Sequence, residues 1–263
     1  MKRSSPHSAE PAAPVPAIEV DHLTVSYGPR PALLDLSVSI EKGLLVGVIG
    51  PNGAGKSTLI KAILGFVRQD VGTVLIEGRP AEHAKGRVAY VPQRGAVDWD
   101  FPIIVREVAM MGRYLAIPWF RGPRTEDRRI VDESLEMVRM SEFRDRQIGQ
   151  LSGGQQQRVF MARALAQGAD ILLLDEPFAG VDAATERAIL DVLERARAAG
   201  KTLVVVHHDL ATAAEYFDRL ILIKQRLYAY GPPAVVLRED LLSEVYEGKL
   251  RVFSDILRDR SGA

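Results

Sequence analysis

The chain contains no cysteine. This absence excludes disulfides, iron–sulfur clusters and zinc sites made of thiolates, and it favours a reducing compartment such as the cytoplasm. The sequence also lacks any apolar run of the roughly 18 to 20 residues that are needed to cross a bilayer. We therefore expect any association with a membrane to depend on a partner.

An excess of either charge is also absent, since 34 Lys and Arg residues balance 34 Asp and Glu residues in a chain of 263. A balanced chain has no global positive field to attract nucleic acid or anionic lipid. The balance does not exclude a local basic patch. We expect no nucleic-acid partner. Hydrophobic residues make up 47% of the chain, a proportion typical of a folded globular protein.

The first 17 residues differ from the rest. They hold four of the 15 prolines, almost no large apolar side chain, and no apolar middle of the kind that signal peptides have. We predict a disordered leader over 1–17, one folded domain over 18–240 and a C-terminal tail over 241–263.

Two kinds of strand pattern follow the leader. Residues 18–28 and 33–40 alternate apolar and polar side chains, which is typical of strands with one solvated face. Residues 44–50, 171–174 and 202–206 are almost wholly apolar, and each run precedes a helical pattern. The sequence therefore predicts an α/β fold with a parallel core sheet beside an antiparallel edge layer.

Residues 103 to about 165 contain no strong strand pattern. Helical patterns cover 105–114 and 128–140, with a Pro- and Gly-rich loop between them at 117–124. We expect a helical subdomain at about 100–165. Further on, residues 219–231 are typical of a β-hairpin, although the turn lacks the usual glycine.

A phosphate-binding loop is predicted at GPNGAGKST, which has the order glycine, four residues, glycine, lysine and a hydroxyl residue. Glycines let backbone N–H groups point at phosphate oxygens, and the following helix adds the positive end of its dipole. Lys56 would contact the β- and γ-phosphates, and Ser57 would bind Mg²⁺. A chance glycine turn is disfavoured by the strand and helix on either side. The expected nucleotide contacts are Gly50, Pro51, Asn52, Gly53, Ala54, Gly55, Lys56, Ser57 and Thr58.

Two carboxylates, Asp175 and Glu176, end the apolar run at 171–174 and precede Pro177. Adjacent side chains on a strand point to opposite faces, so both can serve one site only where the backbone turns. We expect Asp175 to hold Mg²⁺ directly or through water, and Glu176 to polarise an attacking water. An isolated acidic pair would more often end a strand at the surface, but the phosphate loop in the same chain favours the catalytic interpretation.

The octapeptide LSGGQQQR at 151–158, directly before a helical pattern, resembles the signature sequence of the nucleotide-binding subunits of ABC transporters. The resemblance extends over about 18–231. It implies the ABC ATPase fold, a P-loop NTPase with a mostly parallel core sheet, an antiparallel β edge layer and an inserted helical subdomain. It also implies a head-to-tail dimer with a second copy, around two ATP molecules and their Mg²⁺. The signature residues that would close over the partner's γ-phosphate are Ser152, Gly153, Gly154 and Gln155.

The same resemblance assigns roles to four other positions. Tyr27 resembles the aromatic residue that stacks on adenine, and Gln93 resembles the glutamine that reaches Mg²⁺ and the attacking water. Asp182 resembles the aspartate that communicates across the dimer, although its spacing alone more often indicates a helix cap. In VVVHHD the family's switch histidine precedes an aspartate, which favours His208 over His207. The catalytic set is thus Glu176, His208, Lys56 and Gln93, and the Mg²⁺ set is Ser57, Gln93 and Asp175.

Residues 88–114 and the segment EPFAGVDAATE further resemble ATP-binding subunits of transporters for manganese, zinc or chelated iron. The resemblance implies an ATPase at the cytoplasmic face of the cell membrane that powers a separate permease, in a system that includes a solute-binding protein. We expect import of a divalent metal ion, with permease contacts near Gln93 and 99–101. One alternative is a soluble ABC ATPase with a mechanical or scaffold role, and a second is a non-catalytic binding module.

Overall fold

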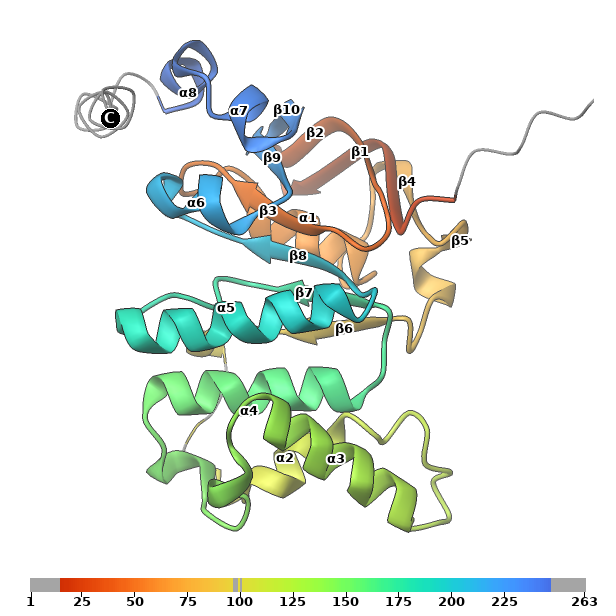
Figure 1. Cartoon of the computed structure of the whole chain (residues 1–263). Helices are drawn as coiled ribbons and strands as arrows, with labels where there is room; N and C mark the ends of the chain where they lie inside the picture. The colour runs from red at the N-terminus through yellow and green to blue at the C-terminus, as the bar shows by residue number, and fades with distance from the viewer. Residues whose placement is uncertain (1–14, 97–98, 100, 247–263) are drawn as a thin grey trace, which may run out of the picture.

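The structure is a computed structural model that describes residues 15–96, 99 and 101–246 (Figure 1).

The fold begins with an antiparallel sheet. The sheet has the order β2-β1-β4-β5 and consists of β1 (Ile18–Tyr27), β2 (Arg30–Ile40), β4 (Val71–Ile76) and β5 (Arg79–Pro80). The predicted antiparallel edge layer is confirmed by β1 and β2, whereas β4 and β5 were not predicted.

The second sheet has six strands in the order β10-β9-β3-β8-β7-β6. The strands from β9 to β6 run parallel and only β10 is antiparallel, so the predicted core sheet is confirmed. The hairpin at 219–231 is also confirmed, and Gln225 at φ 61° supplies the left-handed turn that a glycine usually makes. The strands are β3 (Leu45–Ile49), β6 (Val88–Val91), β7 (Ile171–Leu174), β8 (Thr202–Val206), β9 (Arg219–Lys224) and β10 (Arg226–Gly231).

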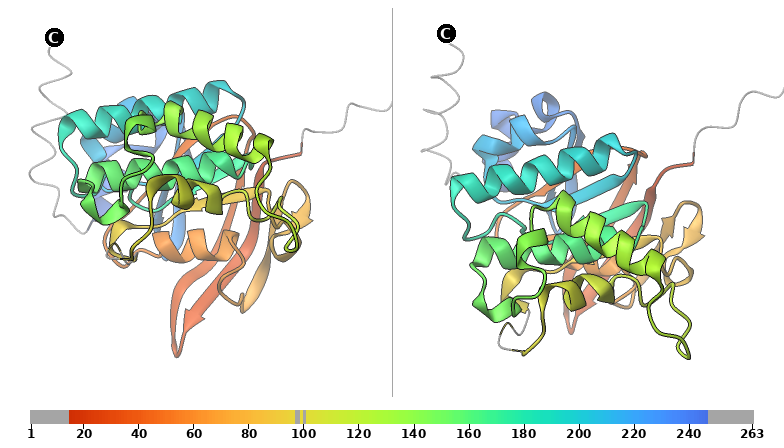
Figure 2. Two further views of the ribbon diagram at one scale, coloured as in Figure 1. Left: turned by 90° about the horizontal axis from the view of Figure 1, so that it is seen from below. Right: turned by 60° about the horizontal axis from the view of Figure 1, so that its bottom comes forward.

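The core lies on both faces of the six-stranded sheet. In β3, Val46 and Val48 face a cluster shared with α1 (Lys56–Ile63) and the antiparallel sheet, while Leu45 and Ile49 face the cluster on the other side. The second cluster includes α5 (Ala183–Ala198) and α6 (Leu210–Tyr216). Figure 2 shows the antiparallel strands on the side of the molecule away from α5. Burial on both faces explains why these strands are apolar without alternation.

Three helices form the region expected to be helical, α2 (Val105–Met111), α3 (Thr125–Met137) and α4 (Gly153–Ala166). They pack on one another through Val108, Leu135 and Phe160, which belong to the same buried cluster as the α5 side of the sheet. Arg163 Nη2 on α4 donates to the Tyr90 carbonyl oxygen at 2.9 Å and so ties this helix to β6. The limits of the folded domain, 18–240, and of the helical subdomain, about 100–165, stay predictions.

The described chain ends with two short helices, α7 (Pro233–Val236) and α8 (Glu239–Val245). Val236, Leu242 and Val245 are buried, so both helices pack on the core. Most of the expected leader and most of the tail lie outside the described residues. None of the described helices has the length and apolar character to cross a membrane. Short 3₁₀ turns occur at η1 (Ala81–His83), η2 (Arg94–Ala96), η3 (Ser141–Phe143) and η4 (Ile148–Gln150).

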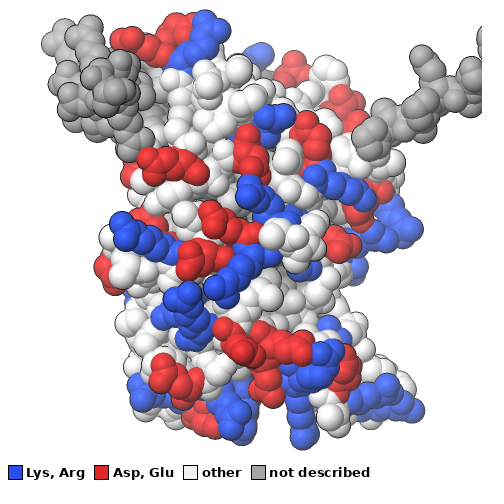
Figure 3. All heavy atoms as spheres, in the orientation of Figure 1, with Lys and Arg blue, Asp and Glu red and all other residues white. Residues whose placement is uncertain are grey.

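Charged side chains of both signs are interspersed over the face of the molecule that Figure 3 shows. On that face there is no broad field of one sign among the described residues, in agreement with the balanced composition. Specific sites therefore have to come from local groupings of side chains.

Candidate nucleotide-binding site

The predicted phosphate loop connects β3 to α1. Gly53 and Gly55 have φ values of 78° and 96°, in the left-handed region that glycine enters without strain. Lys56 is buried, and its Nζ donates to the carbonyl oxygens of Gly50 at 2.7 Å and Pro51 at 3.0 Å. Burial lowers the pKa of Lys56, and the negative charges of Glu176 and Asp175 oppose that shift. The ammonium group thus lies inside the curve of the loop, where phosphate oxygens are expected.

Gly50→Ala is expected to destabilise the protein. At Gly50 (φ 152°) an added Cβ would lie 2.1 Å from the Ile223 carbonyl oxygen, whereas at Gly53 it would meet nothing within 4 Å. We expect the free energy of unfolding to fall by about 2 to 4 kcal/mol in Gly50→Ala, and by about 1 kcal/mol in the control Gly53→Ala, which carries only the φ strain. Urea unfolding checks both values, and equal losses would contradict the packing argument.

Asp175 and Ser57 meet at the carboxyl end of the parallel strands. Asp175 directly follows β7 and is only 4% exposed, and Ser57 Oγ on α1 donates to its Oδ1 at 3.3 Å. Burial raises the pKa of Asp175, and the Ser57 hydrogen bond acts in the opposite direction. A hydroxyl and a buried carboxylate side by side are oxygen donors of the kind that Mg²⁺ prefers.

Glu176 points to a different partner. Its Oε2 accepts a hydrogen bond from Gln93 Nε2 at 2.8 Å, although 83 residues separate them. The backbone turns at Glu176 itself, which has φ 50°, and not only at the following proline. The structure therefore brings Ser57, Asp175, Glu176 and Gln93 together at one edge of the sheet.

The signature residues begin α4. The exposed Ser152 is the N-cap: its Oγ accepts from Gln155 N at 3.4 Å, and Gln155 Oε1 accepts from Ser152 N at 2.9 Å. This reciprocal cap satisfies two backbone groups of the helix end. At Gly154 a Cβ would lie 2.3 Å from Thr185 Cγ2, so the glycine permits close packing against the start of α5. At Gly153 the three atoms nearest to an added Cβ all belong to the flexible end of the Arg94 side chain.

Two further predicted residues lie where a helix begins and where a strand ends. Asp182 is the N-cap of α5, since its carboxylate accepts from Thr185 N at 2.8 Å and from Thr185 Oγ1 at 3.1 Å. The backbone hydrogen bond from Thr185 lowers the pKa of Asp182. Tyr27 ends β1 with 54% of its surface exposed, which leaves its ring accessible to a base.

The two histidines after β8 differ in burial. His207 is buried between Phe178, Tyr216 and Phe217, and its Nε2 lies 2.8 Å from Thr212 Oγ1. His208 is exposed. Of the two rings only that of His208 is accessible from outside, which favours His208 as the predicted switch histidine.

The stability of the fold should depend on the protonation of His207. Burial and the neighbouring His208 lower the pKa of His207 to about 4 from 6.5, while Asp209 opposes the shift. Its Nδ1 has no hydrogen-bond partner within the described part of the chain. Because the unfolded state binds the proton first, the stabilisation is fully present above pH 6.5 and is lost as the pH falls toward 4.

We expect this loss to reach about 2 to 3 kcal/mol near pH 4. Urea titrations between about pH 7 and pH 4.5 measure it, and His207→Gln should flatten the dependence on pH. The exposed His83 supplies the control variant His83→Gln, which should keep the parent slope. If His207→Gln lost stability with falling pH as steeply as the parent does, His207 would not be the group responsible.

Sequence reasoning missed two residues that join the site's parts. Arg94 directly follows Gln93, and its Nε and Nη2 donate to Gln156 Oε1 at 3.3 and 3.2 Å. Thr185 links Asp182 with Gly154. Both contacts join segments that are far apart in the sequence. A single sequence carries no periodic pattern that indicates such contacts. Trp99, expected at a partner surface, packs on Phe160 at 5.0 Å between ring centroids, with its Nε1 donating to the Arg94 carbonyl oxygen.

The phosphate loop, the carboxylate pair at the ends of parallel strands and the antiparallel sheet define a P-loop ATPase of the ATP-binding cassette class. Residues 33–179 match the family described as ABC transporter. The manganese transport system ATP-binding protein MntB of Halalkalibacterium halodurans is 49% identical over 239 residues, which cover 91% of this chain and 95% of that protein. The zinc transport system ATP-binding protein TroB of Treponema pallidum is 50% identical, over 92% of this chain and 91% of that protein.

The fold agrees with these sequence matches. A solved inward-facing structure of a metal-chelate type ABC transporter superposes with a TM-score of 0.78 and 27% identity, over 88% of this chain and 89% of that one. This chain belongs to the ABC transporter family. The predicted family and fold are thereby confirmed.

Proposed function

We propose that this chain is the ATP-hydrolysing subunit of a transporter that imports a divalent metal ion, manganese, zinc or iron, across the cell membrane. The observation that carries the proposal is the pairing of Ser57 with Asp175 and of Gln93 with Glu176 at one edge of the sheet. The kind of cargo rests on the relatives named above, which are about half identical to this chain. The same relatives argue against a soluble ATPase outside transport.

ATP would be held by the phosphate loop and by Tyr27. The loop amides and Lys56 would neutralise phosphate charge, and the exposed Tyr27 would stack on adenine. Ser57 and Asp175 fit Mg²⁺, with Gln93 as a further oxygen donor, and the ion would supply additional neutralisation of the phosphates. Within the described residues no group of three His, Asp or Glu side chains could hold a metal ion, so the cargo is assigned to the partners of this subunit.

Glu176 would act as the base or the water-orienting group. The hydrogen bond from Gln93 fixes one carboxylate oxygen at 2.8 Å, so the other oxygen can accept a proton from water. Glu176 has a positive φ, so its backbone departs from the extended conformation of β7. Asp175, by contrast, accepts its hydrogen bond from Ser57.

A second copy would complete each site. Ser152 is exposed at the start of α4, and Asn52 and Gly53 are exposed in the phosphate loop, so both surfaces are accessible to a partner. A capped helix start with two glycines offers amide groups to an anion without bulky side chains in the way. ATP would thus bring two copies together head to tail, and loss of the γ-phosphate, sensed by His208, would release them.

A groove of about 680 Å³ between the core and α2 is the proposed contact with the permease. Phe66 and Leu115 line it and are 67% and 70% exposed. Arg163 lines the same groove and donates to the carbonyl oxygen of Tyr90, so the groove connects with the strand that leads to Gln93. Phe101, which is 58% exposed, adds apolar surface for the permease.

Reconstitution tests the proposed function. The chain is combined in proteoliposomes with its permease and with a solute-binding protein loaded with manganese, zinc or iron. We expect ATP-dependent uptake of at least one of these ions and ATP hydrolysis that depends on the loaded binding protein. Unchanged hydrolysis without permease, together with no uptake of any of the three ions, would contradict the proposal.

A further inference from the structure

The segment between α2 and α3, residues 113–124, exposes an unusual amount of apolar surface. We call it the α2–α3 loop. Trp119 is 95% exposed, Leu115 70%, Phe120 64% and Tyr114 59%, and these are four of the eleven exposed large hydrophobic residues in the described part of the chain. Such a concentration marks a surface that binds something, because isolated exposed apolar residues are ordinary and clusters are not.

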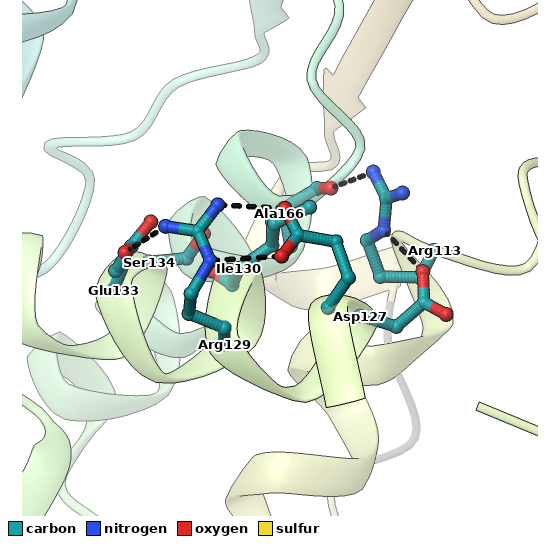
Figure 4. A network of polar contacts seen from close by, with 8 residues as sticks. Arg113, Asp127, Arg129, Ile130, Glu133, Ser134 and Ala166 are labelled. Atoms are coloured by element: carbon teal, nitrogen blue, oxygen red, sulfur yellow. Dashed lines mark hydrogen bonds and ion pairs between the residues drawn. The ribbon is translucent and has the colours of Figure 1, made fainter. Parts of the chain in front are cut away.

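The loop is held in place at its base. Arg113 donates from Nε to Asp127 Oδ1 at 3.1 Å and from Nη1 to the Ala166 carbonyl oxygen at 3.1 Å (Figure 4). The other oxygen of Asp127 accepts from Arg124 N at 3.0 Å, so one buried carboxylate ties both ends of the loop together. The exposed aromatic residues are therefore presented on a fixed base.

The tip has its own internal order. Arg121 N donates to the Pro118 carbonyl oxygen at 2.9 Å, which closes a turn around Trp119 and Phe120. Their rings meet edge to face with centroids 5.8 Å apart, and the Arg121 guanidinium lies 5.5 Å from the centroid of Phe120. In the right-hand view of Figure 2 the loop projects from the lower right corner of the molecule. The result is a convex tip with two aromatic rings and a cation.

The charge of the loop is positive. It contains Arg113, Arg121 and Arg124 and no acidic residue. The acid just beyond it, Glu126, is paired with Arg129, which donates to its two carboxylate oxygens at 2.6 and 2.9 Å. Arg113 is neutralised by Asp127, so the exposed Arg121 and Arg124 give the tip its positive charge.

We propose that the α2–α3 loop binds directly to the surface of an anionic lipid bilayer. Tryptophan and phenylalanine bury their rings among headgroups and upper acyl chains, and arginine binds lipid phosphates while its stem stays in the apolar layer. A convex tip enters a fluid interface without a matching pocket, which a protein partner would have to provide. The balanced charge of the whole chain confines this attraction to the loop.

The orientation of the loop rests on the proposed function. Leu115 lines the groove assigned to the permease and also belongs to the loop. If the groove faces the permease, the neighbouring tip faces the same side, toward the headgroups around it. The lipid contact would then limit the orientation in which the subunit meets the permease.

Vesicle binding tests the proposal with the full chain and without permease, so its failure leaves the proposed function untouched. The parent should bind vesicles of phosphatidylcholine with phosphatidylglycerol, and bind them less at high salt and without the anionic lipid. Trp119→Ala should weaken binding roughly tenfold. Arg121→Gln with Arg124→Gln should weaken it by roughly fivefold per residue.

Control variants alter other exposed positions elsewhere. Val71→Ala removes apolar surface from β4, and Arg79→Gln with Arg226→Gln removes the same charge from other strands. These controls should bind vesicles as the parent does, and all variants should keep the parent ATPase activity. Equal losses in loop and control variants, or no binding to anionic vesicles, would overturn the proposal.

Fluorescence locates the contact, since the chain has only two tryptophans and Trp99 packs on Phe160. Brominated lipids should quench the parent, and Trp119→Phe should abolish the quenching. A photo-crosslinker at position 119 then separates the two partners in native membranes. Lipid adducts support the proposal, and adducts with the permease alone contradict it.

Discussion

Glu176→Gln is expected to bind ATP as the parent does, to lose turnover by about 10²- to 10⁴-fold, and to accumulate as a dimer in the presence of ATP. The amide keeps the size of the side chain but cannot take a proton from water. The site around Ser57 and Asp175 is unchanged, so ATP affinity is expected to stay the same. Titration with ATP, steady-state hydrolysis and light scattering measure the three properties.

The exposed Glu194 on α5 supplies a control with the same change of charge. Glu194→Gln should hydrolyse ATP at the parent rate and should not accumulate as a dimer. Parent-like hydrolysis in Glu176→Gln would show that another group activates water.

Two inactive variants are expected to restore activity to each other. Lys56→Ala damages the phosphate loop, and Gly153→Asp places a negative charge where the partner's γ-phosphate is expected. Gly153→Asp should fold, because the new side chain meets the flexible Arg94 guanidinium, which is a favourable neighbour for a carboxylate. In a mixed dimer one site combines an intact phosphate loop with an intact signature, so the mixture should reach up to about a quarter of parent activity.

The control for this experiment is the double variant Lys56→Ala with Gly153→Asp. Mixing it with either single variant leaves both sites of a mixed dimer with at least one defect, and hydrolysis should stay at background. A mixture of the single variants that is no more active than either alone would contradict the shared site.

The sequence predicted those parts of the fold that local patterns encode. Apolar runs followed by helical periodicity located β3, β7 and β8, because strands buried on both faces need apolar side chains at every position. β6 was missed because Val88–Val91 includes Ala and Tyr and is not followed by a helical pattern, and β5 has only two residues. The strand order β10-β9-β3-β8-β7-β6 depends on packing between distant segments, which no local pattern records.

In the site, too, local patterns predicted some residues, whereas features that depend on the three-dimensional structure were not predicted. The phosphate loop and the carboxylate pair could be predicted because their spacing alone indicates their chemistry. The sequence indicates that the backbone must turn near the acidic pair, but not that Glu176 itself has the left-handed backbone. The resemblance favours His208 because Asp209 follows it, and the burial of His207 against Phe178 agrees with that choice. The contact between Arg94 and Gln156 joins residues 62 positions apart.

The dependence of ATP hydrolysis on protein concentration tests the shared site most directly. If two copies must meet to complete a site, the rate per chain rises in proportion to concentration when the protein is dilute, and levels off when light scattering reports dimers with ATP. A rate per chain that stays constant down to concentrations at which every molecule is a monomer would contradict the account.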